Sequence, residues 1–218
     1  MLILNKKLQM KDKKRSLVTY LFPDSYIADQ FRTIRTNIRF VTGETNKKVF
    51  LIASPGSGDG KSIIVANLAA SMAQQKERIL LIDANLRSPV IHTIFNLPNN
   101  KGIGNILRHR IPIKEAVCKT EIGKLDILTS GEASFNPAEI IGSELMEDLI
   151  KSAAAEYDVV LIDAPSVLEY TETRMLANYC DGVLFLLKRA KTELEKASEA
   201  IRVLELAQSQ IVGAIMNE

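Results

Sequence analysis

The stretch "SPGSGDGKS", residues 54–62, constrains the fold of this chain more than any other part of its sequence. It follows the apolar run "KKVFLIAS", which predicts a buried strand, and leads into "KSIIVANLAASMAQQ", which predicts a helix. A glycine-rich loop that closes on Lys-Ser between a strand and a helix is typical of a phosphate-binding loop, or P-loop. Glycine lets the backbone turn close to a phosphate, and the start of the helix directs N–H groups at the anion. The sequence therefore predicts a nucleoside triphosphate site.

The loop also supplies the candidate nucleotide contacts. Lys61 offers a mobile positive charge to the β- and γ-phosphates, and the Ser62 hydroxyl can ligate Mg²⁺. Pro55 stands where the full pattern has glycine, but the "GDGKS" core is intact. The predicted nucleotide-binding residues are Ser57, Gly58, Asp59, Gly60, Lys61, Ser62 and Ile63.

Two further apolar runs end on an aspartate. "RILLIDA" presents Asp83 and "YDVVLIDAP" presents Asp163. A P-loop needs an acid at the end of a neighbouring buried strand to hold Mg²⁺, and a second acid can orient or deprotonate an attacking hydroxyl. The simpler alternative for either residue is a turn-forming aspartate at a strand end. We predict catalytic roles for Lys61, Asp83 and Asp163, and a metal site formed by Ser62, Asp163, Asp83 and Asn85.

The rest of the chain continues the alternation of apolar strands and helices. "LDILTS", "DGVLFLLK" and "IVGAIMN" predict strands, and "SELMEDLIKSAAAEY" and "TELEKASEAIRVLELAQSQ" predict helices. This order predicts an α/β P-loop NTPase fold: a mainly parallel sheet with helices on both faces, as a three-layer sandwich. We expect a basic N-terminal tail at residues 1–24 and a single domain at 25–218, with no membrane-spanning run.

The net charge of the chain and the pattern of its first residues indicate its possible partners and its location. The formal charge of +2 is too small to indicate a nucleic-acid partner. The opening residues lack a secretory signal, so we expect a cytoplasmic protein. A basic cluster in the tail could be a solvated segment or a contact with the anionic inner leaflet of the membrane. This cluster comprises Lys6, Lys7, Lys11, Lys13, Lys14 and Arg15.

Four segments together resemble the bacterial tyrosine kinases of capsule and exopolysaccharide synthesis, which are P-loop proteins related to the MinD/ParA ATPases. They are "GSGDGKS", "LLIDANLRSPVIHTIFNLPNNKGIGNIL", "LTSGEASFNPAEIIGS" and "YDVVLIDAPSV". The resemblance covers residues 25–217 and makes the second segment a Walker A′ motif and the last a Walker B motif. Gly56 stands where MinD-type proteins carry a signature lysine, which favours the kinases.

The resemblance implies an ATP- and Mg²⁺-dependent protein-tyrosine kinase domain. It also implies activation by the cytoplasmic tail of a membrane-spanning protein of the polysaccharide co-polymerase type. The kinase would then be recruited to the inner face of the membrane and would phosphorylate tyrosine-containing proteins. Asp29, Arg32 and Arg35 share one helix face and resemble the family's Glu-x-x-Arg-x-x-Arg subunit contact, which implies a homo-oligomeric ring.

Several positions depart from the family pattern. Asn85 replaces the second Walker A′ aspartate, and losing that charge is expected to weaken transfer by about 10²-fold. Ala164, Ser166 and Glu172 also differ from the usual residues around and beyond Walker B. The chain has no C-terminal tyrosine cluster, so we expect either further residues in the natural chain or phosphorylation of another chain.

Two other functions remain open. Asn85 is compatible with a catalytically weak, nucleotide-binding regulatory subunit of the same machinery, that is, a pseudokinase. The basic tail is compatible with a MinD/ParA-like ATPase that cycles on a membrane. Arg87 also has alternatives: it could anchor its loop, reach a phosphate, or contact a neighbouring subunit.

Overall fold

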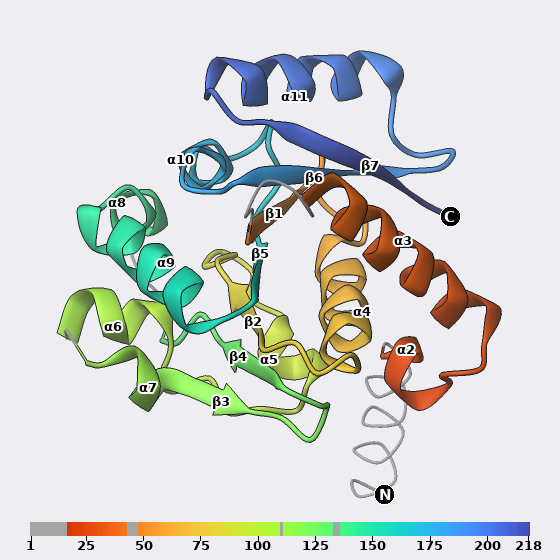
Figure 1. Ribbon diagram of the computed structural model, residues 1–218. Helices are drawn as coiled ribbons and strands as arrows, with labels where there is room; N and C mark the ends of the chain where they lie inside the picture. The colour runs from red at the N-terminus through yellow and green to blue at the C-terminus, as the bar shows by residue number, and fades with distance from the viewer. Residues whose placement is uncertain (1–16, 43–47, 110, 133–135) are drawn as a thin grey trace, which may run out of the picture.

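The computed structural model describes residues 17–42, 48–109, 111–132 and 136–218 (Figure 1). The basic cluster of the predicted tail lies outside these residues. Within the described ranges, no helix is both long and apolar enough to cross a bilayer.

A seven-stranded sheet in the order β3-β4-β2-β5-β1-β6-β7 forms the centre of the molecule. Neighbouring strands are parallel except β3, which runs antiparallel to β4. The central strands are apolar and buried, as expected for a parallel sheet covered on both faces. Of the strands in the described residues, only the short β3 was not predicted from the sequence. The bounds are β1 Val49–Ala53, β2 Ile79–Asp83, β3 Val117–Lys119, β4 Leu125–Leu128, β5 Val159–Asp163, β6 Gly182–Lys188 and β7 Ile211–Asn217.

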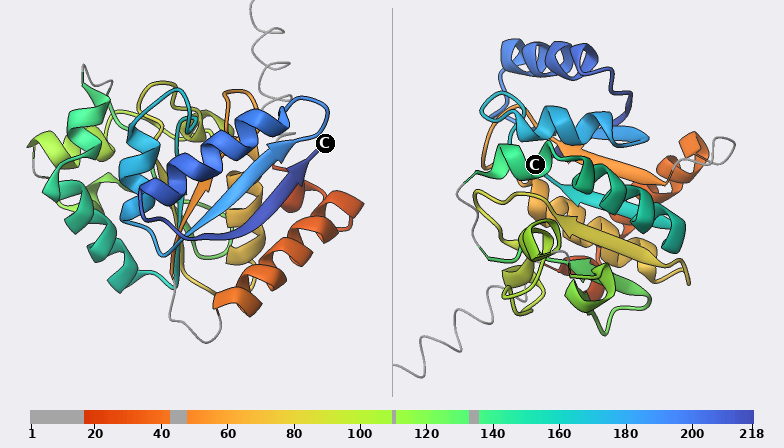
Figure 2. Two further views of the ribbon diagram at one scale, coloured as in Figure 1. Left: turned by 90° about the horizontal axis from the view of Figure 1, so that it is seen from above. Right: turned by 90° about the vertical axis from the view of Figure 1, so that its left-hand side faces the viewer.

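Helices cover both faces of the sheet (Figures 1 and 2). One apolar cluster joins the sheet to α3, α4, α5 and Leu17, the residue before α2, on one face. A second cluster joins the sheet to α6 through α11 on the other face. The predicted P-loop fold with helices on both faces is confirmed. The bounds are α2 Val18–Leu21, α3 Tyr26–Thr42, α4 Lys61–Ala73, α5 Ile91–Ile94, α6 Ile103–His109, α7 Ile113–Ala116, α8 Pro137–Ile141, α9 Glu144–Glu156, α10 Glu172–Asn178 and α11 Leu194–Leu206.

The short helix α2 packs on α4, the helix that follows the P-loop. The Thr19 N–H donates to Asn67 Oδ1 at 3.0 Å, and Gln74 Nε2 donates to the Thr19 carbonyl at 3.1 Å. Leu17 and Thr19 are both buried. The packed part of the chain therefore includes Leu17 and α2, which the sequence analysis assigned to the tail.

Helix α3 carries the three residues predicted to contact another subunit, but the structure separates them. Arg35 lies on the face of α3 that packs against α4, where its Nη1 donates to the Ser71 carbonyl at 2.5 Å. Arg32 instead pairs with Asp29 and donates to the Pro23 carbonyl at 2.6 Å on the exposed side. Arg35 is therefore buried against α4. Asp29 and Arg32 are exposed, so they are the better candidates for a subunit contact.

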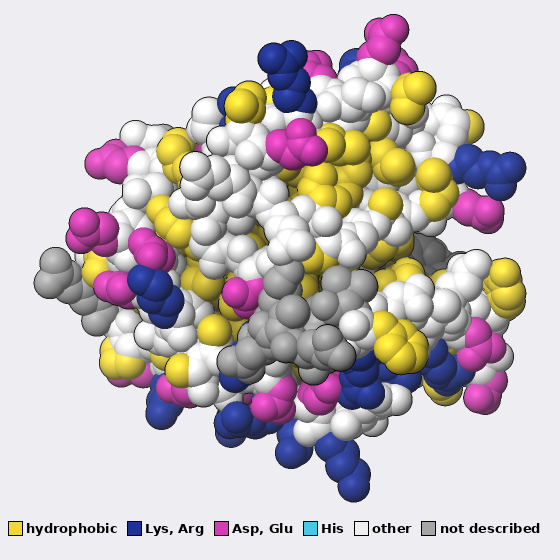
Figure 3. Space-filling view, turned by 45° about the horizontal axis from the view of Figure 1, so that its top comes forward, with side chains coloured by type: hydrophobic (Ala, Val, Ile, Leu, Met, Phe, Trp, Pro, Cys, Tyr) yellow, Lys and Arg dark blue, Asp and Glu magenta, His cyan; other side chains and the backbone are white. Residues whose placement is uncertain are grey.

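Charged side chains of both signs are interspersed around the rim of the face shown in Figure 3. Apolar side chains gather near the upper centre of the same view. A groove between α3 and β7 also has an apolar lining that includes Ile34, Ile38 and Val212. This face therefore combines a mixed-charge rim with limited apolar surface.

Candidate functional site

The carboxyl ends of β1, β2 and β5 meet at one edge of the sheet because the three strands are adjacent and parallel. Asp83 ends β2 and Asp163 ends β5, and the register places the two residues side by side. The Ala84 N–H donates to the Asp163 carbonyl at 2.9 Å, which ties the two strand ends together. Strand β1 runs into the P-loop at the same edge.

The P-loop adopts backbone conformations that favour glycine. Gly58 has φ 72° and Gly60 has φ 97°, and α4 begins at the next residue, Lys61. The Lys61 ammonium donates to Ser54 Oγ at 2.9 Å and to the Gly56 carbonyl at 3.2 Å. Burial lowers the pKa of Lys61, and the nearby Asp163 opposes that shift. The loop thus holds a buried lysine at the start of a helix, where an anion binds favourably.

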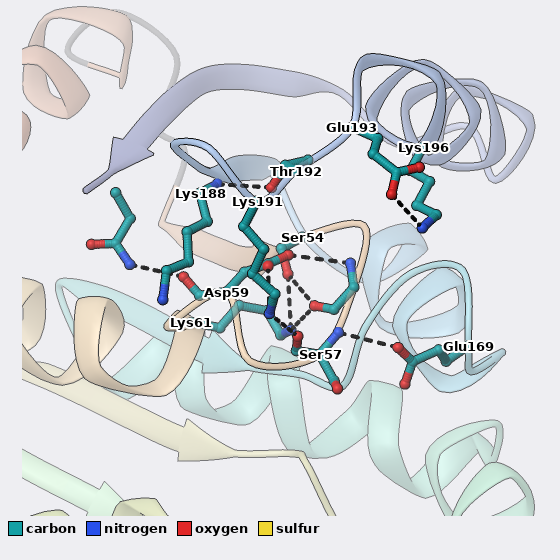
Figure 4. A network of polar contacts seen from close by, with 12 residues as sticks. Ser54, Ser57, Asp59, Lys61, Glu169, Lys188, Lys191, Thr192, Glu193 and Lys196 are labelled. Carbon is teal, nitrogen blue, oxygen red and sulfur yellow. Dashed lines mark hydrogen bonds and ion pairs between the residues drawn. The ribbon is translucent and has the colours of Figure 1, made fainter.

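Contacts from distant parts of the chain support the loop from outside (Figure 4). Lys191 Nζ donates to the Ser57 carbonyl at 2.7 Å and pairs with Asp59 Oδ1 at 3.3 Å. Glu169 Oε1 accepts from the Ser57 N–H at 3.1 Å, and Asn217 Nδ2 donates to the Asp59 carbonyl at 2.8 Å. Sequence reasoning missed Glu169, Lys191 and Asn217, because no local pattern links them to the loop.

Ser62 and the two aspartates form the candidate metal centre. Ser62 Oγ donates to Asp163 Oδ2 at 2.5 Å, and Asp83 Oδ2 accepts from the Ile91 N–H at 3.1 Å. The other oxygens, Asp83 Oδ1 and Asp163 Oδ1, are buried without a hydrogen-bond partner among the described residues. Two buried carboxylates with free oxygens beside a hydroxyl fit a hard divalent cation such as Mg²⁺, which prefers oxygen ligands.

A pocket of about 420 Å³ opens over these residues. It brings together most of the predicted nucleotide-binding residues, and Asn85 and Arg87 as well; the predicted residues that line it are Ser57, Gly58, Gly60, Lys61, Ser62 and Ile63. The Asp59 side chain lies outside this pocket, since it is buried and accepts from the Gly56 N–H at 3.2 Å. Asp83 and Asp163 are fully buried and do not line the pocket either. This burial favours a metal-holding role for Asp83 over the predicted direct contact with an attacking hydroxyl.

Arg87 anchors its loop in this structure, which was one of the three predicted alternatives. Both Nε and Nη2 lie 2.8 Å from Glu172 Oε1. The guanidinium also stacks over the Tyr170 ring, 4.5 Å from its centroid. Glu172 and Tyr170 are further residues of the site region for which sequence reasoning found no role.

The pKa shifts of the two aspartates predict a pH-dependent response to Mg²⁺. Burial raises the pKa of Asp163 to about 6, and burial followed by the Asp163 charge raises the pKa of Asp83. Without metal, the folded state binds these protons more tightly than the unfolded state. The carboxyl groups therefore cost stability as the pH rises from about 4 through the raised pKa values. Mg²⁺ needs both carboxylates ionised, so its stabilising effect should appear over the same pH range.

We expect Mg²⁺ to raise the Tm by about 5–10 °C above about pH 7, at about 100 times its Kd. Below about pH 5 we expect almost no change, because protons then occupy the site. Thermal melts at both pH values, with ADP present throughout, measure the effect. The double variant Asp83→Asn/Asp163→Asn is the control and should show no Mg²⁺ response at either pH. An equal Mg²⁺ response of the wild type at both pH values would refute the assignment of the metal centre.

Comparison with known proteins identifies relatives of this chain. A family model described as an AAA domain matches residues 47–215. The tyrosine-protein kinase YwqD of Bacillus subtilis is 40% identical over 204 residues, which make up 94% of this chain and 86% of YwqD. The crystal structure of the chimerical protein CapA2B2 matches with a TM-score of 0.89 at 32% identity, over 93% of this chain and 89% of that chain.

A more distant structure has the same fold. The septum site-determining protein MinD of Pyrococcus horikoshii, complexed with Mg-ADP, matches with a TM-score of 0.67 at 21% identity. The match covers 78% of this chain and 69% of that one. The likenesses to YwqD and CapA2B2 extend over far more of the chain than this one does.

Proposed function

This chain belongs to the family of bacterial tyrosine-protein kinases of polysaccharide biosynthesis, and we propose that it transfers the γ-phosphoryl group of ATP to tyrosine hydroxyls of proteins. The reaction depends on Mg²⁺ and regulates capsule or exopolysaccharide synthesis. The observation that carries the proposal is a pair of buried carboxylate oxygens beside the P-loop hydroxyl of Ser62: Asp83 Oδ1 and Asp163 Oδ1 have no hydrogen-bond partner within the described part of the chain. Burying two carboxylates side by side is costly unless a cation compensates them, so their burial favours a metal centre.

The residues of the site have separate roles in phosphoryl transfer. Lys61 and the N–H groups at the start of α4 bind the β- and γ-phosphates. Ser62, Asp83 and Asp163 would hold Mg²⁺, which would neutralise charge on the phosphates. The tyrosine oxygen bonds to the γ-phosphorus as the bond to the ADP oxygen breaks, so ADP leaves and the phenolic proton passes to solvent. The loose transition state of this transfer needs little proton removal by a general base. Asp83 can therefore be buried without losing a required contact with the hydroxyl.

One assay tests the proposal. The full chain is incubated with labelled ATP, Mg²⁺ and a tyrosine-containing protein, with and without the cytoplasmic tail of a membrane-spanning activator. We expect label on tyrosine, more of it with the tail, and a loss of at least about 10²-fold in Lys61→Met. Lys151→Met is the matched control, because Lys151 pairs with Glu147 on α9, outside the pocket. The absence of tyrosine label from the wild type with its activator tail would overturn the proposal.

The proposed partners follow from the same family. The activator is a membrane-spanning protein of the polysaccharide co-polymerase type, which recruits the kinase to the inner face of the membrane. A homo-oligomeric ring forms through the exposed pair of Asp29 and Arg32, while Arg35 stabilises the packing of α3 on α4.

The ring makes a separate prediction. We expect the molar mass from light scattering to fall to that of a monomer in Asp29→Ala/Arg32→Ala, because the variant removes both exposed charges of the contact. The comparison variant Glu193→Ala/Lys196→Ala removes another exposed ion pair, at the start of α11, and should keep the wild-type mass. If the mass of Asp29→Ala/Arg32→Ala equals that of an oligomeric wild type, the proposed contact is wrong.

Asn85 supports a second candidate function, a nucleotide-binding regulatory subunit with weak catalysis. Asn85 lines the pocket, and its Oδ1 accepts from the Ser88 N–H at 3.3 Å. An amide can hold a metal-bound water, but it supplies no negative charge to the metal. Nucleotide binding without tyrosine label in the assay above would favour this candidate. A MinD/ParA-like ATPase is a weaker alternative, because Gly56 replaces the signature lysine.

A further inference from the structure

The pair formed by Arg87 and Glu172 joins two segments that are distant in the sequence but flank the metal centre. Arg87 lies in the middle of the β2–α5 loop, residues 84–90, and Glu172 is the first residue of α10. The Glu172 side chain is 2% exposed, whereas that of Arg87 is 40% exposed. A buried carboxylate destabilises the fold unless it is paired. The contact with Arg87 compensates this cost for Glu172.

The β2–α5 loop wraps around the Asp83 carboxylate. It leaves β2 at Ala84, which is bonded to β5, and it returns at Ile91, whose N–H donates to Asp83 Oδ2 at 3.1 Å. Between these ends, Ser88 and Val90 are exposed. Arg87 is the residue of this exposed stretch that reaches across to α10. Arg87 therefore ties the exposed part of the loop to α10.

Glu172 and Tyr170 hold Arg87 in one orientation. Two guanidinium nitrogens share a single carboxylate oxygen at 2.8 Å, and the Tyr170 ring covers one face of the guanidinium. The second oxygen, Glu172 Oε2, is buried without a hydrogen-bond partner among the described residues. Among the described residues, Arg87 is therefore the partner that compensates the buried charge of Glu172.

We propose that Arg87 and Glu172 are positioning residues, which fix the β2–α5 loop so that Asp83 stays in place beside Asp163 for Mg²⁺. The inference rests on the proposed function, because it concerns the same metal centre. Neither residue touches the metal or the nucleotide in this role. They act through the backbone of the loop and the Ile91 N–H.

The competing role for Arg87 is a direct contact with phosphate, since it lines the pocket. The variant Glu172→Gln separates the two roles. If Arg87 positions the loop, Glu172→Gln and Arg87→Met both lower the gain in nucleotide affinity that Mg²⁺ provides. If Arg87 binds phosphate, Glu172→Gln frees it, so nucleotide binds more tightly even without Mg²⁺.

The test measures the affinity of the full chain for a fluorescent ATP analogue with saturating Mg²⁺ and with EDTA. We expect the ratio of the two affinities to fall about 10-fold in Arg87→Met and in Glu172→Gln, as is typical for residues that support metal ligands from outside. The affinity in EDTA should stay within about two-fold of wild type in both variants. An unchanged ratio in Glu172→Gln, or a wild type without any Mg²⁺-dependent gain, would overturn the inference.

Hydrogen exchange provides a readout that needs no metal. In the metal-free chain, the amide of Ile91 should exchange faster in both variants, because the loop that carries its bond to Asp83 is released. The double variant Arg87→Met/Glu172→Gln leaves no uncompensated buried charge, so it covers the case in which Arg87→Met alone fails to fold. Its affinity ratio should equal that of Glu172→Gln, because either change already releases the loop. Wild-type protection of Ile91 in a folded double variant would contradict the inference.

The pair of Arg39 and Glu77 offers a matched control. It is another arginine–glutamate contact, at 2.5 Å, and Glu77 also has a buried oxygen without a hydrogen-bond partner among the described residues. It lies near the start of β2, at the opposite end of the strand from Asp83. Arg39→Met and Glu77→Gln should leave the affinity ratio unchanged. Every readout here is nucleotide binding or hydrogen exchange. A wild type without kinase activity would therefore refute the proposed function, but it would not by itself refute the positioning role of Arg87 and Glu172.

Discussion

The variant Asp163→Asn is expected to transfer phosphate about 10³-fold more slowly than the wild type. Asp163 is fully buried, and its Oδ1 has no hydrogen-bond partner among the described residues. Asparagine keeps an oxygen that can accept from the Ser62 hydroxyl, so the local structure is preserved while the negative charge is lost. The measurement is the initial rate of tyrosine labelling over a range of Mg²⁺ concentrations.

The same variant should have the opposite effect on stability without metal. Asp83 and Asp163 are buried side by side, and each carboxylate disfavours ionisation of the other. Removing one of the two charges therefore raises the Tm of the metal-free chain near pH 7. A slower enzyme that is more stable without Mg²⁺ is the pattern expected of a metal ligand, whereas a purely structural residue would lose both activity and stability.

Asp126→Asn is the matched control for this prediction. Asp126 lies on β4 and accepts from the Tyr157 hydroxyl at 2.9 Å, much as Asp163 accepts from Ser62. It does not line the nucleotide pocket. Its variant should keep a wild-type rate and a wild-type dependence on Mg²⁺. A wild-type rate in Asp163→Asn, or an equal loss in both variants, would remove Asp163 from the metal centre.

The fold and the core of the site were predictable because their signals are local. Each central strand is a continuous apolar run, and Asp83 and Asp163 follow directly at the ends of two such runs. Parallel strands bring their carboxyl ends to one edge of the sheet, so two aspartates in this context must lie near the P-loop. The strand order itself, with β5 between β1 and β2, is needed to place them side by side.

The supporting contacts were not predictable, because they join residues far apart in the sequence. Lys191 and Asn217 come from the connection after β6 and the end of β7, yet both bind the P-loop. Lysine and asparagine at such positions look like ordinary solvated residues in the sequence. Only the packing of β6 beside β1 brings them within hydrogen-bonding distance.

The burial of Arg35 was not predictable for a related reason. A charged residue on an amphipathic helix is usually exposed, and the resemblance to a subunit-contact motif reinforced that expectation. The structure instead places Arg35 between the buried Phe31 and Ile38, on the face that meets α4. The predicted grouping of Arg35 with Asp29 and Arg32 on one helix face gave no sign that the Ser71 carbonyl was available as its partner.

The variant Asn85→Asp is expected to raise the rate of tyrosine phosphorylation about 10²-fold. Asn85 is half-buried in the wall of the pocket, two residues beyond Asp83, and its side chain already accepts from the Ser88 N–H at 3.3 Å. An aspartate can keep that hydrogen bond, so the change adds a negative charge with little change of shape. The added charge strengthens the binding of Mg²⁺ and of its water shell.

A cost in stability should accompany this gain. A third carboxylate near Asp83 and Asp163 increases the repulsion among like charges, so the metal-free variant should melt below the wild type near pH 7. Mg²⁺ with ADP should restore the Tm, and the increment should exceed that of the wild type. Melts with and without Mg²⁺ measure this difference, and Asn99→Asp, on the separate contact with Gly131, is the comparison variant.

The outcome of this experiment decides between the candidate functions. If Asn85→Asp accelerates a wild type that already labels tyrosine, the natural chain is a kinase whose rate is limited by the missing charge at the metal centre. If Asn85→Asp labels tyrosine and the wild type does not, the natural chain is the regulatory subunit, and one side-chain amide is the reason. A wild-type kinase whose rate does not respond to Asn85→Asp would show that the charge of Asp83 and Asp163 is sufficient for the metal. The effect attributed to Asn85 would then be wrong.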